Sequence, residues 1–179
     1  MGGVARAQWV VHALGGTVET LQPDHKTMYV ITDDGSGGDF KFAASPSVSV
    51  SFDKEVRSEA VTTDKFNGQG HHVVLFYFGD DRVRTAYAVE DVGTGPFVKT
   101  TGTVVSYDKH GRTLTVTAKD GTSQKFVIDD KTVVDTPDGV ATGKKLHLNK
   151  GDQVRLLAQS EKGGVTALLV RTGGIDTTI

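Results

Sequence analysis

Hydrophobic and polar residues alternate along short stretches of this chain, most clearly between Thr113 and Thr117. There Leu114 and Val116 fall on one face and threonines on the other, which is the period-two pattern of a half-buried antiparallel strand. Comparable short stretches lie at 102–107, 124–128, 154–158 and 165–171, separated by turns rich in Gly, Asp and Lys. The pattern predicts an all-β chain of short strands and tight turns.

The pattern occurs twice along the chain. The segments 16–18, 27–30 and 34–35 recur at 102–104, 113–116 and 120–121, all at the same offset of 86 residues. Further on, Phe42 matches Phe126 and Val50 matches Val134 at an offset of 84, because the turn at 36–38 is expected to be two residues longer in the first copy. The segment 85–89 returns as 166–170 at an offset of 81. The shared offsets indicate an internal duplication.

The duplication divides the 179 residues into two small domains. We expect the first repeat at 8–93, a linker at 94–96, the second repeat at 97–172 and a C-terminal tail at 173–179. Short, strongly twisted strands can satisfy their edges by closing into a small barrel. The expected fold is therefore two tandem antiparallel β-barrels.

The succession of Gly-Thr-Val, Thr-Leu-Thr-Val, Gln-Lys-Phe-Val-Ile-Asp-Asp-Lys-Thr-Val-Val and Lys-Gly-Asp-Gln-Val in the second repeat resembles a known family. It is similar to the small OB-like β-barrel repeats of exported bacterial proteins of unknown function, over 102–171 and more weakly over 16–92. The resemblance implies an extracytoplasmic setting and carries no catalytic residues. The strand order also resembles periplasmic copper-carrier barrels, for which Met28 and Trp9 offer a thin match.

Composition narrows the possible partners and locations. A net charge of −2 gives no electrostatic case for nucleic acid, and no apolar run reaches the 18 or so residues of a membrane-spanning helix. The absence of cysteine excludes disulfides and thiolate chemistry. Ala5 and Ala7 have the spacing of a signal-peptidase site without the usual hydrophobic stretch, so we expect a secreted or periplasmic protein whose export signal is not present in this chain.

One strand face differs between the two repeats. Val74, Phe76 and Phe78 occupy the positions that hold Arg155, Leu157 and Gln159 in the second repeat. A wholly apolar face of this size should be covered. Either the second barrel or a lid from 53–70 covers it, or it binds another subunit or partner. Trp9, in the leading segment outside the repeat core, either anchors that segment by packing or caps a ligand face, and we include it among the interface residues.

Candidate metal ligands are few. Asp33, Asp34 and Asp39 lie in a glycine-rich loop whose oxygens could hold calcium, but an Asp-Gly hairpin turn explains the same residues. His71 and His72 are adjacent on a strand, so their side chains point to opposite faces and cannot easily chelate one ion. We therefore expect no cofactor.

No nucleophile elbow or phosphate loop is present, and we expect a protein that is not an enzyme. The leading hypothesis is a structural subunit or interaction module that binds a protein partner or itself. The extensions at 8–13 and 171–179 could add a strand to a neighbouring sheet. The alternative is a barrel that binds a small ligand or a metal.

Overall fold

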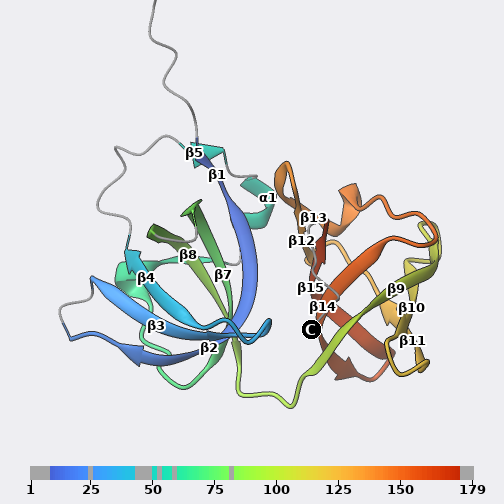
Figure 1. Ribbon diagram of the computed structural model, residues 1–179, viewed down its shortest axis with the longest axis horizontal. Helices are drawn as coiled ribbons and strands as arrows, with labels where there is room; N and C mark the ends of the chain where they lie inside the picture. The colour runs from blue at the N-terminus through green and yellow to red at the C-terminus, as the bar shows by residue number, and fades with distance from the viewer. Residues whose placement is uncertain are drawn as a thin grey trace, which may run out of the picture.

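The protein is described by a computed structural model that covers residues 9–23, 26–42, 50–51, 54–57, 60–80 and 83–173. Strands form two barrels that lie side by side, the first in blue to green and the second in yellow to red (Figure 1). The all-β class expected from the alternating pattern is confirmed.

The first barrel is a sheet in the order β4-β3-β2-β7-β8, and a further pairing of β4 with β8 closes it. A short strand, β6, extends the sheet beyond β8, and β1 and β5 form a separate parallel pair. The bounds are β1 (Trp9–Val10), β2 (His12–Leu21), β3 (Thr27–Thr32), β4 (Gly38–Phe42), β5 (Val50–Ser51), α1 (Lys54–Arg57), β6 (Val61–Thr62), a 3-10 turn (Thr63–Lys65), β7 (His72–Asp80) and β8 (Val83–Gly93).

The second barrel repeats this order as β11-β10-β9-β14-β15, and a pairing of β11 with β15 closes it. Two further strands extend it along β15, first β12 and then β13. The bounds are β9 (Val98–Asp108), β10 (Thr113–Ala118), β11 (Ser123–Val127), β12 (Val133–Thr136), β13 (Gly139–Thr142), a 3-10 turn (Gly143–Lys145), β14 (Gln153–Glu161) and β15 (Gly164–Thr172).

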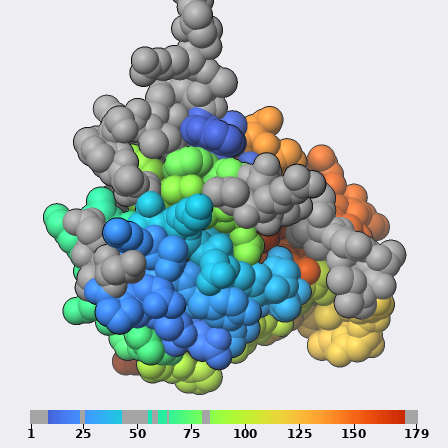
Figure 2. All heavy atoms as spheres, turned by 60° about the vertical axis from the view of Figure 1, so that its left-hand side comes forward, coloured from blue at the N-terminus to red at the C-terminus, as the bar shows by residue number. Residues whose placement is uncertain are grey.

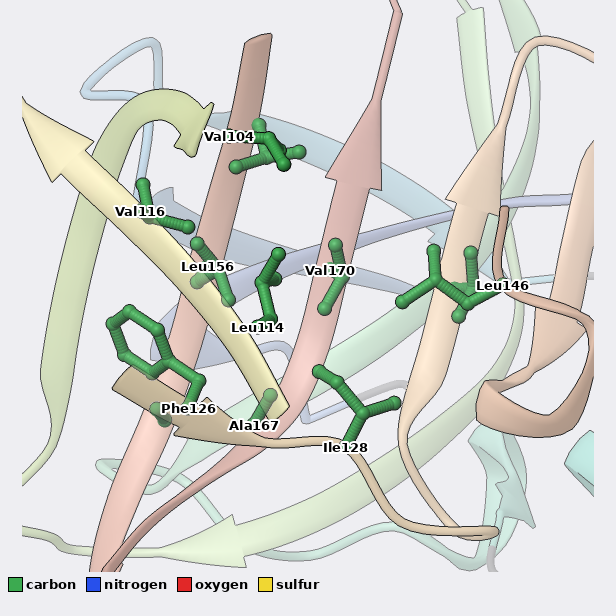
Figure 3. Packing of buried hydrophobic residues seen from close by; sticks show 12 residues of the cluster. Val104, Leu114, Val116, Phe126, Ile128, Leu146, Leu156, Ala167 and Val170 are labelled. Carbon is green, nitrogen blue, oxygen red and sulfur yellow. The ribbon is translucent and has the colours of Figure 1, made fainter. Parts of the chain in front are cut away.

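Each barrel has its own hydrophobic core. In the second barrel Leu114, Phe126 and Leu156 point inward from three different strands and are almost fully buried (Figure 3). In the first barrel Met28, Phe40 and Leu75 fill the same kind of space. Burying such side chains stabilises a fold by roughly 1.5–3 kcal/mol each. Every barrel therefore has an interior that is filled rather than hollow.

The two barrels share their strand register. Gly16 lies opposite Val73 in the first barrel, and Gly102 lies opposite Val154 at the matching positions of the second. The irregularities also match, because the pairing of β7 with β8 shifts after Phe76 and that of β14 with β15 shifts after Leu157. The pairing of β2 with β3 shifts by one residue between Val18 and Thr20. The pairing of β9 with β10 shifts in the same way at Val105.

The expected match of Phe42 with Phe126 is wrong. Phe40 lies opposite Met28, as Phe126 lies opposite Leu114, so the offset stays at 86 and the intervening turns are equally long. Phe40 and Phe42 share one face of the strand, so alternation alone could not choose between them. The match of Val50 with Val134 also fails, because Val50 in β5 pairs with β1 whereas Val134 in β12 pairs with β15.

Two glycines at matching positions allow strands to approach closely. A Cβ atom at Gly16 would lie 2.8 Å from the carbonyl oxygen of Ile31, and one at Gly102 would collide with the carbonyl oxygen of Thr117. Ile31 and Thr117 are themselves 86 residues apart. The same close contact between neighbouring strands thus occurs in both barrels.

We predict that Gly102→Ala lowers the free energy of unfolding by about 1–3 kcal/mol, because the added methyl group meets backbone that cannot move without breaking the sheet. Urea unfolding measures the change. Gly163→Ala is the control, since no atom lies within 4 Å of a Cβ added there. An equal loss in both variants would contradict the close-approach explanation.

Candidate functional site

The two barrels meet through the outer faces of matching strands. Phe76 on β7 and Leu157 on β14 occupy matching positions, and both are buried in one apolar cluster with Ala88 and Leu169, a second matching pair. The first barrel stands in front in Figure 2, and the second barrel (yellow to red) lies behind it. The buried members of the cluster are Val11, Ala13, Val56, Val74, Phe76, Ala88, Val133, Leu157 and Leu169.

The residues predicted to form an interface divide between two places. Val74 and Phe76 lie inside the contact between the barrels and are fully buried. Val56, from the segment considered as a lid, belongs to the same cluster. Phe78 is 6% exposed, and its ring lies 5.5 Å from that of Trp9, which is 51% exposed. Of the predicted interface, only the Trp9 end therefore faces outward.

We predict that Phe76→Lys lowers the free energy of unfolding by about 3 kcal/mol or more, since it removes a large buried ring and places a charge where the barrels meet. Chemical denaturation gives the value. Ile31→Lys, on the exposed face of β3, is the matched control and should change stability by less than about 0.5 kcal/mol. Unchanged stability of Phe76→Lys would mean that the apolar contact does not hold the barrels together.

A buried carboxylate, Asp33, joins the barrels at one side of this contact. Its Oδ2 lies 3.0 Å from Nε2 of His72 in the same barrel, and its Oδ1 lies 2.8 Å from the Lys99 ammonium of the second barrel. Arg155, also from the second barrel, donates to the Asp33 carbonyl oxygen at 3.3 Å. Burial on its own would raise the pKa of Asp33, but the hydrogen bonds from His72 and Lys99 outweigh it and lower that pKa below 3.8.

Thr17, His72 and Asp33 form a hydrogen-bonded series in the order nucleophile, base and acid. The Thr17 hydroxyl lies 3.0 Å from Nδ1 of His72. The matching residues of the second barrel form the same kind of bond, from Gln153 to Thr103, without any histidine. The His72 ring is 5% exposed and lies against Phe97 at 5.0 Å. The series therefore fits a cross-strand contact better than a site that must admit a substrate.

A second carboxylate, Asp135, joins the barrels elsewhere along the contact. Its side chain is 6% exposed, and it accepts from Arg171 Nε at 3.2 Å within its own barrel. His12 of the first barrel places Nδ1 2.9 Å from the other oxygen of Asp135. That hydrogen bond raises the pKa of His12 above 6.5, against the opposing effects of burial and of Arg171.

The acidic glycine-rich loop forms a turn. Asp34 accepts hydrogen bonds from the Ser36 backbone at 2.9 Å, from the Ser36 hydroxyl at 2.6 Å and from Thr32. Although burial opposes the change, these bonds lower the pKa of Asp34 to about 2. In the second barrel Asp120 accepts from the Thr122 backbone at the matching place. The Asp34 carboxylate is thus already occupied within its own turn.

The remaining predicted metal ligands lie apart from one another. Asp39 is exposed on β4, and His71 bonds Asp91 at 2.8 Å while His72 bonds Asp33. Within the ranges that the structure describes, no three His, Cys, Asp or Glu side chains come together in a way that could hold a metal ion. The two histidines have different partners, as expected from their opposite orientations.

Sequence reasoning missed Lys99, Asp135 and His12 as residues of the contact. For Lys99 a signal was present in the sequence, because a charged residue stands where the first repeat has Ala13. The structure places Ala13 in the apolar cluster and Lys99 beside Asp33, so both positions lie where the barrels meet. Nothing along the sequence indicates that His12 lies beside Asp135, because 123 residues separate them.

The expected strand-adding extensions pair, where described, within this chain. Residues 9–10 form β1, which pairs with β5 apart from the barrel sheet, residues 12–13 begin β2 and residues 171–172 end β15. Residue 8 and residues 174–179 lie outside the described ranges. No helix among the described residues is long and apolar enough to cross a membrane.

The chain matches no protein-family model and none of the curated proteins with which it was compared. What can be inferred about its function therefore comes from its own geometry.

Proposed function

We propose that this chain is a non-catalytic protein that acts through protein contacts, either as a subunit of an assembly or as an interaction module. The observation that carries the proposal is the pair of Trp9 and Phe78. A tryptophan that is half exposed yet supported by a buried ring offers a large, ordered apolar surface, and such residues contribute strongly to protein–protein binding.

The joined barrels support this proposal. Val74, Phe76 and Leu157 on the outer faces of β7 and β14 are covered within the chain, so these side chains are not available to a partner. A body of two barrels fixed against each other presents its outer surface with little loss of conformational freedom on binding, which favours affinity. The Trp9 end of the contact is where apolar surface continues to the outside.

We further propose that the two barrels arose by tandem duplication of an OB-like unit. The common strand order, the matching registers and the matching irregularities support this origin, as does the close approach at Gly16 and Gly102. The proposed setting is secreted or periplasmic. It rests on the resemblance to exported barrel repeats and on the spacing of Ala5 and Ala7.

One observation favours a second candidate, a barrel that binds a small ligand. A pocket of about 170 Å³ opens at the end of the second barrel. Lys109, Arg112 and Lys144 line it beside Tyr107, and Arg112 pairs with Asp130 at 3.0 Å. Asp129 and Asp130 also line the pocket, so its three cations exceed its carboxylates by one, and this small positive excess favours a small anion.

We predict that the chain self-associates and that Trp9→Ala weakens this association by roughly tenfold or more, since the substitution removes an aromatic anchor. Native mass spectrometry across a concentration series measures it. Tyr29→Ala, which removes an exposed aromatic residue from the outer face of β3, is the control and should have little effect. A monomer at every concentration contradicts the subunit version, and a retained small anion of fixed stoichiometry would favour the ligand-binding candidate.

A further inference from the structure

The hydrogen bond between His12 and Asp135 connects the barrels in a way that a single proton can change. His12 stands at the start of β2 in the first barrel, and Asp135 lies in β12 of the second. The His12 side chain is 31% exposed, so water can reach it, whereas Asp135 is almost fully buried. The exposed partner of this bond is therefore also the one that titrates near neutral pH.

Loss of the His12 proton would not leave Asp135 without a cation. Arg171 of the same barrel holds the other carboxylate oxygen at 3.2 Å, so the second barrel keeps its buried charge compensated. What weakens is the bond from Asp135 to the first barrel, because a hydrogen bond between two charged groups is about twice as strong as one with a neutral donor.

We propose that protonation of His12 controls how tightly the two barrels are held together near this bond. With the ring charged, His12 and Asp135 hold β2 against β12. With the ring neutral, the apolar cluster still joins the barrels, and the contact around β2, β12 and β13 opens more often.

The direction of the pH dependence follows from the charged groups around His12. Asp135 on β12 raises the pKa of His12, Arg171 on β15 opposes that change, and Tyr77 on β7 lies with its ring 6.3 Å away. The neighbouring strand β13 carries no charged residue. Because the pKa in the folded protein is above 6.5, the extra stability is complete below pH 6.5 and is lost as the pH rises through that raised value.

The backbone provides a reporter beside the switch. The amide of Val140 on β13 donates to the carbonyl oxygen of Val11, the residue before His12, at 3.1 Å and across the two barrels. Its hydrogen-exchange protection factor measures how often this part of the contact opens. The amide of Leu156, which pairs within the second barrel, provides a reference for opening of that barrel alone.

The test follows both amides by NMR while the pH is raised through the His12 titration. We expect the Val140 protection factor to fall by roughly three- to tenfold, the added strength of a charge-assisted over a neutral hydrogen bond. The midpoint should coincide with that of the His12 ring resonance, and Leu156 should stay more strongly protected than Val140 throughout, because the contact opens without unfolding of the barrel. A Val140 protection factor that stays flat, or one that equals that of Leu156 at every pH, would overturn the proposal.

Three variants assign the effect to one ring. His12→Gln should give a Val140 protection factor that is low and independent of pH. His71→Gln removes an exposed histidine that bonds Asp91 within the first barrel, and it should keep the pH dependence. His72→Gln introduces the residue that the second barrel has at the matching position. This variant should also keep the pH dependence of the Val140 protection factor. The assignment to His12 would be contradicted by pH dependence that survives in His12→Gln, or by pH dependence that disappears in His72→Gln.

Discussion

The apolar contact between β7 and β14 is the constraint on which the rest of the structure depends. Each barrel closes around its own core, yet the outer face of β7 carries Phe76 where a solvated strand would carry polar groups. Leu157 at the matching position of β14 meets the same cluster. Two barrels with the same register thus cover each other through nearly equivalent faces, an arrangement comparable to the self-complementary contact of a two-fold dimer.

The polar groups around this contact fix its geometry more than they add to its strength. Burying Asp33 and Asp135 costs desolvation energy, which good hydrogen bonds largely offset rather than exceed. Each of these carboxylates binds one residue of its own barrel and one of the other. Arg155 and Arg171 lie directly opposite each other on β14 and β15, where like charges repel. Their placement becomes favourable because Asp33, Asp34 and Asp135 face the same region.

Much of this architecture could be predicted from the sequence, because alternation and shared offsets report on strands and on repeats. The alternation of Leu114 and Val116 with threonines correctly predicted the strand β10. Alternation and offsets could not separate Phe40 from Phe42, which share a strand face. Comparison of the repeats identified the apolar face of Val74 and Phe76, but not which of its possible occupants covers it. The hydrogen bond of His12 with Asp135 could not be predicted from the sequence, because it depends on how the two folded barrels pack against each other and no local sequence pattern indicates it.

The central claim is that the shared apolar contact makes the two barrels one cooperative body, and differential scanning calorimetry tests it most directly. We predict a single unfolding transition for this chain, with calorimetric and van't Hoff enthalpies that agree. Two separate transitions, or a van't Hoff enthalpy near half the calorimetric value, would show that each barrel unfolds alone, and that the buried face of Phe76 and Leu157 does not couple them.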